Sequence, residues 1–346
     1  MKCTVAVSGG SDSLYALLSL REMGYEVSAL HALFLPSTPG KGPAAALAGL
    51  CGELGIPFEA VDLTEEFRRS VIEPFAQAHA QARTPNPCAL CNRAMKFGLL
   101  LRHALRAGGL YATGHYASLE DHPVYGPALK TASYAAKDQS YFLALVPVER
   151  LRSCLFPLAD KTKPETRSWL EERGYPIPLP SESQEICFIP NDDHCAWLEN
   201  QRESGLELPG DGPVVLAGEN RVIGRHRGLW QYTEGQRRGL RIAWKNPLYV
   251  VARRREDNTL IVGSKEMLHA ETCTVSDLNI MVPEHLWPGE VFLRVRYRHA
   301  PVPADIILKE GRMLAHFHKA QEPPAPGQIA AVYDGDGFLL AGGILE

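Results

Sequence analysis

The chain has 346 residues, 45% of them hydrophobic and 22% charged, which is the composition of an ordinary soluble, globular protein of about two to three domains. Its formal net charge of −4 excludes a uniformly basic surface, so any polyanionic partner must contact a local patch. Met1 leads directly into strand-like sequence without a signal peptide, and no apolar run is long enough to cross a membrane. We therefore expect a cytoplasmic monomer without membrane attachment, whose eight cysteines serve reactivity or metal binding rather than a disulfide framework.

The first motif is the loop Ser8-Gly-Gly-Ser-Asp-Ser13, which follows the strand-like run 3–7 and precedes the helical pattern 14–23. A glycine pair lets the backbone approach an anion, and the free N–H groups at a helix start favour a phosphate. The loop lacks the lysine of a Walker motif and the third glycine of a dinucleotide fold, which disfavours a methyltransferase. The alternative is an ordinary turn in which Asp12 and Ser13 cap the helix.

The first part of the chain alternates strand and helix patterns, which predicts a doubly wound α/β domain with a parallel sheet over residues 1–200. The expected strands are 3–7, 26–33, 58–63 and 110–113, and the expected helices are 14–23, 44–54 and 93–107. Asn92 is the expected N-cap of the last helix. In such sheets ligands bind at the carboxyl ends of the strands, where the loop 8–13 would lie.

Short β-like segments and turns dominate the rest of the chain, after a breaker at 208–213. We expect a small β-rich central domain over 205–267, with strands at 214–216, 221–224, 248–252 and 260–262. A C-terminal β-barrel is expected over 268–346, with strands at 291–298, 329–334 and 338–344. The central domain is rich in arginine and aromatic residues between Arg221 and Arg255, which suits RNA or, equally, a solvated β-surface with core aromatics.

Two cysteine-containing segments complete the set of motifs: Thr84-Pro-Asn-Pro-Cys-Ala-Leu-Cys-Asn92 and Ser183-Gln-Glu-Ile-Cys-Phe-Ile189. Together with Ser8–Ser13, they make the chain resemble the tRNA-specific 2-thiouridylases of the MnmA/TrmU family, which belong to the PP-loop ATP pyrophosphatases. The resemblance extends over nearly the whole length. It also rests on the segments 112–116, 137–142, 156–158, 162–164, 232–240, 296–298 and 333–336.

The resemblance implies an ATP-dependent enzyme that replaces the C2 oxygen of the wobble uridine in tRNA by sulfur, releasing AMP and pyrophosphate. Cys187 matches the cysteine that carries the persulfide, and Cys91 matches its partner in sulfur release or disulfide formation. Asp12 would lie beside the phosphates of ATP, either as a ligand of Mg²⁺ or as an aid to activation. We also expect a thiolate at Cys91, just before the helix predicted at 93–107. ATP would be held by Ser8, Gly9, Gly10, Ser11, Asp12, Ser13, Leu33 and Gly114. Contacts with the anticodon loop, including a flipped wobble base, are expected from His115, Lys137, Asp138, Gln139, Arg237, Arg238, Arg296 and Tyr297. A cysteine desulfurase or a sulfur-carrier protein is the implied sulfur donor.

The chain departs from the family pattern at Cys88, where aspartate is usual. Cys88, Cys91 and Cys187 could therefore hold an iron–sulfur cluster, for instance [4Fe–4S], that binds hydrosulfide, or, with a fourth ligand, zinc. Arg241 replaces a common glycine, and 36–43 is shorter than usual. Two other hypotheses are an ATP pyrophosphatase acting on a small carboxylate or another tRNA base, and a non-catalytic RNA-binding metalloprotein. The leading hypothesis requires Cys91 and Cys187 to meet beside the loop 8–13.

Overall fold

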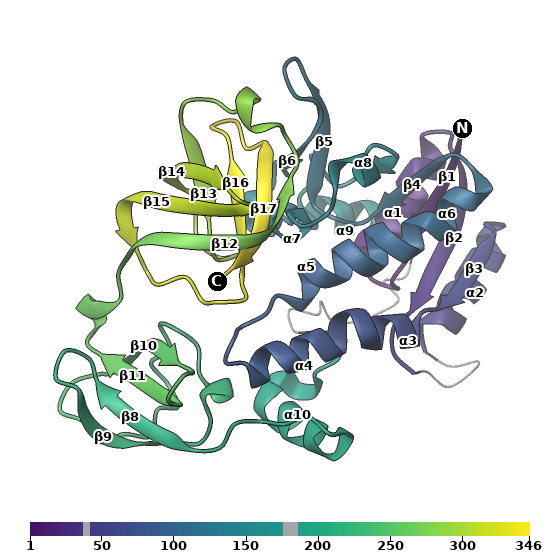
Figure 1. Cartoon of the computed structure of the whole chain (residues 1–346). Helices are drawn as coiled ribbons and strands as arrows, with labels where there is room; N and C mark the ends of the chain where they lie inside the picture. The colour runs from purple at the N-terminus through teal and green to yellow at the C-terminus, as the bar shows by residue number, and fades with distance from the viewer. Residues whose placement is uncertain (37–41, 176–185) are drawn as a thin grey trace.

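The computed structural model describes residues 1–36, 42–175 and 186–346. Part of the short segment 36–43 and the first residues of the segment 183–189 lie outside the described residues. Figure 1 shows a sheet domain on one side of the molecule and two β domains, one above the other, on the other side. Within the described residues, no helix is both long and apolar enough to cross a membrane.

The sheet domain contains a five-stranded parallel sheet in the order β3-β2-β1-β4-β7. Its strands are β1 (Lys2–Ala6), β2 (Glu26–Leu33), β3 (Phe58–Asp62), β4 (Leu110–Thr113) and the short, unpredicted β7 (Cys154–Leu155). The middle of β1 is a run of buried residues, as expected for a strand covered on both faces. The parallel sheet with helices confirms the predicted fold class of this domain.

The helices of the sheet domain begin and end at recognisable signals. Pro43 occupies the first turn of α2, and Gly55 ends it in the left-handed conformation, while Thr162 and Glu165 form a capping box at the start of α9. The longer ones are α1 (Ser11–Glu22), α2 (Pro43–Leu54), α9 (Lys163–Glu172) and α10 (His194–Gln201). Shorter ones are α7 (Ser140–Leu143) and α8 (Val148–Leu151), and an unpredicted hairpin, β5 (Ala117–His122) and β6 (Gly126–Thr131), precedes them.

Two further helices are composite, with π-helical stretches in their middle. One runs through α3 (Thr64–Phe67), η1 (Arg68–Ile72) and α4 (Glu73–Ala80). The other runs through α5 (Pro87–Cys91), η2 (Asn92–Leu100), α6 (Leu101–Ala104) and η3 (Leu105–Ala107). The prediction that this helix begins at Arg93 with Asn92 as its N-cap is wrong. Asn86 is the N-cap, since its side-chain oxygen accepts the Ala89 N–H at 3.1 Å. The helix then starts at Pro87, because proline has no N–H group that would need a partner in the first turn.

The middle domain is a four-stranded sheet in the order β10-β11-β8-β9. Its strands are β8 (Gly212–Leu216), β9 (Arg221–His226), β10 (Tyr249–Arg254) and β11 (Thr259–Gly263). The C-terminal domain is a closed barrel in the order β12-β15-β14-β13-β16-β17. Its strands are β12 (Ala270–Ile280), β13 (Val291–Arg294), β14 (Val302–Lys309), β15 (Arg312–Gln321), β16 (Ile329–Tyr333) and β17 (Leu339–Leu345). The predicted barrel is thereby confirmed, although the strand expected at 291–298 already ends at Arg294.

The barrel packs directly on the sheet domain. One hydrophobic cluster contains Phe67 and Phe97 of the sheet domain together with Ile329, Tyr333 and Leu339 of the barrel. At this contact Asn279 donates to the carbonyl groups of Ala144 and Val146, each at 2.9 Å. The two domains therefore share a core, which fixes the barrel relative to the sheet.

Candidate active site

The loop Ser8–Ser13 joins β1 to α1 at the carboxyl edge of the sheet, between β1 and β4, where the strand order reverses direction. Gly9 has a φ of 91°, a conformation that glycine adopts without strain. Ser13 Oγ donates to the Gly10 carbonyl at 2.9 Å and accepts the Ser8 N–H at 3.1 Å. The N-cap of α1 is Gly10, which offers no side-chain acceptor to the first turn. Asp12 and Ser13 therefore do not cap this helix, and its first N–H groups suit an anionic ligand.

Asp12 is held from two sides. Tyr116 donates to its Oδ1 at 3.0 Å, and Lys163 donates to its Oδ2 at 2.7 Å and to Ser11 Oγ at 3.1 Å. The Lys163 side chain is only 12% exposed, and it sits in the first turn of α9, where the helix dipole disfavours a cation. The sequence analysis assigned no role to Lys163. A lysine at the first position of a helix, where the helix dipole disfavours a positive charge, could have indicated a functional role. The site therefore offers an anion both a cation and the N-terminus of α1.

Gly114 follows β4 and touches the start of α1. A Cβ atom at this position would lie 2.8 Å from the Asp12 carbonyl carbon and 2.8 Å from the Ser13 nitrogen. Only glycine allows the two backbones to come so close, so Gly114 helps to set the position of the loop 8–13. Leu33, the other expected nucleotide contact, lies half-buried at the carboxyl end of β2.

His115 follows Gly114 and lies within range of the Lys96 charge, which also acts on the cysteines. It is buried and its Nδ1 lies 2.8 Å from Thr113 Oγ1. Burial, and then the charge of Lys96, hold the pKa of His115 well below its ordinary value, so its imidazole is neutral. The ring of Phe97, beside Lys96, packs 5.4 Å from the His115 ring.

Cys88, Cys91 and Cys187 lie within electrostatic range of one another and of Lys96. Burial raises the pKa of Cys91 to about 12, the Lys96 ammonium opposes this rise, and negative charge on Cys187 or Cys88 would add to it. Cys187 and Cys88 are exposed residues, but desolvation of their thiols also raises the pKa of each one. The Lys96 charge lowers both pKa values. Cys91 and Cys187, which are far apart in the sequence, are thus close enough for charge on Cys187 to affect Cys91, and the Lys96 charge acts on both.

The expected thiolate at Cys91 is not supported. Cys91 is the last residue of α5 rather than a residue before a helix start, and it is buried, so its thiol stays protonated at neutral pH. Lys96 is the residue that sequence reasoning missed. It follows Cys91 by five positions in the π-helical stretch, where such a spacing returns to the same side of the helix.

The cysteines do not form the expected metal ligand set. In residues 1–36, 42–175 and 186–346, no group of three or more histidine, cysteine, aspartate or glutamate side chains is arranged to hold a metal ion. All eight cysteines, including Cys91 and Cys187, are free thiols, and the disulfide that the resemblance implies for sulfur release stays a prediction. The iron–sulfur cluster and the zinc ion therefore have no preformed ligand set among these residues, and both stay predictions. Asp12 offers a carboxylate of the kind that Mg²⁺ prefers, but its two oxygens already accept from Tyr116 and Lys163, and Mg²⁺ at Asp12 stays a prediction.

The segment 137–140 borders this region and connects it to the barrel. Gln139 Oε1 accepts the Tyr116 N–H at 3.0 Å, and Lys137 is half-buried. Asp138 is 3% exposed, and its Oδ2 accepts Ser140 Oγ at 2.9 Å and Arg294 Nη1 at 3.2 Å. A direct RNA contact by Asp138 is therefore not supported, because its carboxylate is buried and binds Ser140 and Arg294, which hold this segment against the barrel.

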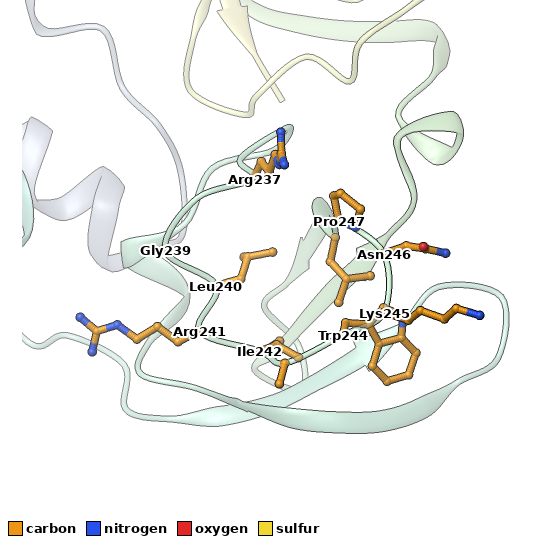
Figure 2. A pocket seen from close by; sticks show the side chains of 11 residues that line it. Arg237, Gly239, Leu240, Arg241, Ile242, Trp244, Lys245, Asn246 and Pro247 are labelled. Carbon is orange, nitrogen blue, oxygen red and sulfur yellow. The ribbon is translucent and has the colours of Figure 1, made fainter.

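Arg237 and Arg238 are exposed in the loop between η7 (Leu229–Gln231) and β10. Arg237 and the residues 239–248 line an open groove with a volume of about 580 Å³. Figure 2 shows Arg241 and Lys245 pointing outward from opposite sides of this groove. Trp244 is 40% exposed, and the Arg221 guanidinium lies 5.2 Å from its ring centroid. Arg241 has a φ of 55°, which explains why a glycine would be favoured there.

Other members of the expected basic patch are not free cations. Arg225 pairs with Asp211 and Arg254 with Asp257, and Arg253 is buried against Glu234. Arg296 donates to the carbonyl groups of Glu234 at 3.1 Å and Pro323 at 2.9 Å, between the middle domain and the barrel. Tyr297 is half-buried, with its ring 4.4 Å from that of Phe142. The basic surface is thus smaller than the sequence pattern indicates, and it centres on the groove.

Three family models match the chain in the order of its domains. They are described as tRNA methyl transferase HUP domain over residues 1–191, tRNA methyl transferase PRC-barrel domain over 206–264 and Aminomethyltransferase beta-barrel domain over 270–345. A solved structure, U34-tRNA thiolase NcsA from Methanococcus maripaludis with its [4Fe-4S] cluster, matches at a TM-score of 0.33 and 16% identity. This match covers 59% of this chain and 67% of that chain, and a likeness so weak carries no argument.

Curated relatives match over the full length. The tRNA-specific 2-thiouridylase MnmA of Nitratidesulfovibrio vulgaris (strain DP4) is 49% identical over 346 residues, which cover 100% of this chain and 99% of that protein. The protein of the same name from Lawsonia intracellularis (strain PHE/MN1-00) is 46% identical over 353 residues, with the same coverage of 100% and 99%. Given identity at this level from end to end, the chain belongs to the MnmA family of tRNA-specific 2-thiouridylases and is an enzyme of that family.

Proposed function

We propose that this enzyme uses ATP to convert the wobble uridine of tRNA to 2-thiouridine, with Cys187 as the persulfide carrier and Cys91 as its partner. The names of the relatives support the substrate and the product. The observation that carries the mechanism is that the Lys96 charge acts on the three cysteines and also on His115, the residue after Gly114, which touches the loop 8–13. A phosphate-binding loop and a group of thiols in the same domain suit a reaction that needs both.

The first step activates an oxygen that would otherwise leave poorly. The loop 8–13 and Lys163 hold the phosphates of ATP, and Mg²⁺ bound at Asp12 would neutralise their charge. The uridine C2 oxygen attacks the α-phosphorus, the bond to the β-phosphate breaks, and pyrophosphate leaves. The uridine now carries AMP on its C2 oxygen, which makes that oxygen a good leaving group.

The second step exchanges oxygen for sulfur. The terminal sulfur of a Cys187 persulfide attacks C2, and AMP departs with the oxygen and the electron pair of the broken bond. The Cys91 thiolate then attacks Cys187 Sγ, the persulfide S–S bond breaks, and its electrons pass to the sulfur on C2. The products are 2-thiouridine and a Cys91–Cys187 disulfide, which an external dithiol reduces. Burial keeps the Cys91 thiol protonated in the resting enzyme, so Cys91 must lose its proton before this attack, and the Lys96 charge, which lowers its pKa, favours that loss.

We further propose that the groove beside Arg237 and Arg238 holds the RNA backbone, since arginines bind phosphates and the exposed Trp244 can stack on an unpaired base. The target base must leave its stack to reach the thiols. A cysteine desulfurase or a sulfur-carrier protein would load Cys187, whose exposure in the structure suits transfer from another protein.

The test measures tRNA-dependent AMP release and, by mass spectrometry of digested tRNA, 2-thiouridine. The Cys187→Ala variant should lose 2-thiouridine but keep AMP release, and Cys273→Ala, a barrel control, should keep both. Full thiolation by Cys187→Ala would contradict the persulfide mechanism. The competing cluster mechanism predicts iron and sulfide in anaerobically purified protein, and their loss, with the activity, in Cys88→Asp. Iron-free protein with full activity would exclude that mechanism.

A further inference from the structure

Thr84 is the residue at which all three domains meet. It lies in the sheet domain just before α5, yet its N–H donates to the Pro326 carbonyl of the barrel at 2.7 Å. Its own carbonyl accepts Gln328 Nε2, also from the barrel, at 2.8 Å. Its Oγ1 accepts Arg253 Nη2 of the middle domain at 3.0 Å and lies 3.2 Å from Thr233 Oγ1. Every polar group of Thr84 is thus bonded to another domain.

Arg253 holds the middle-domain side of this contact in a fixed orientation. Its Nε and Nη2 donate to the two carboxylate oxygens of Glu234 at 2.9 and 2.7 Å, and its Nη1 donates to the Tyr232 carbonyl at 2.7 Å. The two side chains are 0% and 7% exposed. A buried ion pair contributes little net stability, because desolvation offsets the attraction. Its rigid, bidentate geometry is better suited to fixing the position of Thr84.

This junction has functional groups close to it on both sides. Toward the surface, Thr233 is followed within a few residues by Arg237 and Arg238. Gln236 ties that loop down, because its Oε1 accepts the Thr233 N–H at 3.0 Å. Toward the interior, Thr84 is followed by the cap of α5 and by Cys88 and Cys91. The Thr84 hydroxyl is therefore a direct polar connection between the segment that leads to the thiols and the segment that leads to the arginine loop.

We propose that Thr84 is a positioning residue for the reaction: through Arg253 and Thr233 it sets Cys91 and its helix in register with the RNA bound at the arginine loop. The inference rests on the proposed function. When Thr84 loses its hydroxyl, RNA still binds at the surface and ATP still binds at the loop 8–13, but the segment leading to Cys91 is held less firmly. Thr84 touches neither substrate, so its effect acts on turnover rather than on binding.

The test compares Thr84→Val, which keeps the shape and removes the hydroxyl, with Thr84→Ser, which keeps the hydroxyl. Thr272→Val, on an exposed barrel strand, is the matched control. We expect Thr84→Val to lower kcat for 2-thiouridine formation about tenfold, with the Kd for tRNA and the KM for ATP within about twofold. Thr84→Ser and Thr272→Val should stay within about twofold of the parent in all three.

A second readout does not depend on activity. Iodoacetamide labelling of each cysteine, followed by peptide mass spectrometry, should show about tenfold faster labelling of Cys91 in Thr84→Val, because the segment opens more often. The buried Cys3 and Cys51 of the same domain should keep their slow labelling. Faster labelling of all three cysteines would mean general unfolding and would overturn the inference, as would an unchanged kcat or an equal loss in Thr84→Ser. If the parent enzyme makes no 2-thiouridine, the proposed function fails, while the labelling still tests the junction.

Discussion

Gly114 offers a sharp test of how the sheet domain positions the nucleotide. Replacing Gly114 by alanine adds one methyl group, which would lie 2.8 Å from the backbone of Asp12 and Ser13. Carbon atoms in contact prefer a separation of about 3.5 Å or more, so the loop or β4 must move by about 0.7 Å. Neither neighbour is a flexible side chain that could turn away.

Two magnitudes follow from this displacement. Overpacking of a tight contact costs about 1 to 3 kcal/mol of unfolding free energy. A displacement of about 1 Å in a positioning element can lower the rate by about a hundredfold, so we expect Gly114→Ala to lower kcat/KM for ATP by at least about tenfold. The displaced atoms belong to the loop that holds the phosphates, so ATP rather than tRNA should be affected.

The assay is tRNA-dependent AMP release at varied ATP concentration, together with the melting temperature. Gly52→Ala is the matched control, because a Cβ there meets nothing within 4 Å on the helix α2. Alanine should stabilise that helix by about 0.5 to 1 kcal/mol and leave kcat/KM unchanged. A Gly114→Ala enzyme with the parent's kcat/KM for ATP would refute the assignment of the loop 8–13 as the nucleotide site.

Four further predictions concern charged residues and thiols. Lys163→Met removes the cation that pairs with Asp12 at 2.7 Å, so the KM for ATP should rise about tenfold in the AMP assay. The control is Lys161→Met, because the partner of Lys161 is the exposed Asp160, and it should change this KM less than about twofold. Equal effects of the two variants would contradict a specific role of Lys163. Lys96→Met removes a charge that lowers the pKa of Cys187, so the pKa of Cys187 should rise in this variant. Its thiolate fraction at pH 8 should therefore fall, and iodoacetamide should label Cys187 several-fold more slowly. In the parent enzyme, labelling of Cys91 should accelerate about tenfold per pH unit toward its pKa of about 12, and Cys273, whose pKa burial alone raises, should not respond to Lys96→Met. Finally, Arg237→Ala and Arg238→Ala should each lower the slope of log Kd for tRNA against the logarithm of the salt concentration by about one. The control Lys309→Ala, at an exposed position on the barrel, should leave this slope unchanged. An unchanged slope in both arginine variants would mean that the RNA binds elsewhere.

The parallel sheet and the barrel could be predicted because hydrophobic periodicity and turn residues report local structure. The start of α5 could not, since Pro-Asn-Pro reads as a break in the chain. The structure shows instead that Asn86 caps a helix whose first residue is Pro87. That error also produced the expectation of a thiolate at Cys91. Residue type alone does not say whether a cysteine lies before a helix or inside it.

The candidate site shows a similar division. Glycine and cysteine motifs identified the loop 8–13 and the three cysteines, because those residue types are unusual in such patterns. Lys96 and Lys163 escaped notice, since a lysine gains a role only from what the fold places beside it. Asp138 was expected to contact the RNA and Arg253 to belong to the basic surface, yet both are buried and bonded to other domains. Burial of a charge depends on distant segments and leaves no local trace in the sequence.

The common core of sheet domain and barrel bears on how this enzyme can be divided. Three separate family descriptions suggest modules that a protein engineer could cut apart or exchange. A chain truncated before residue 270 would instead leave apolar surface around Phe67 and Phe97 bare to water, since barrel side chains such as Leu339 complete that cluster. The barrel is therefore part of the core on which the sheet domain depends, and a graft between relatives should take the sheet domain and the barrel from the same parent.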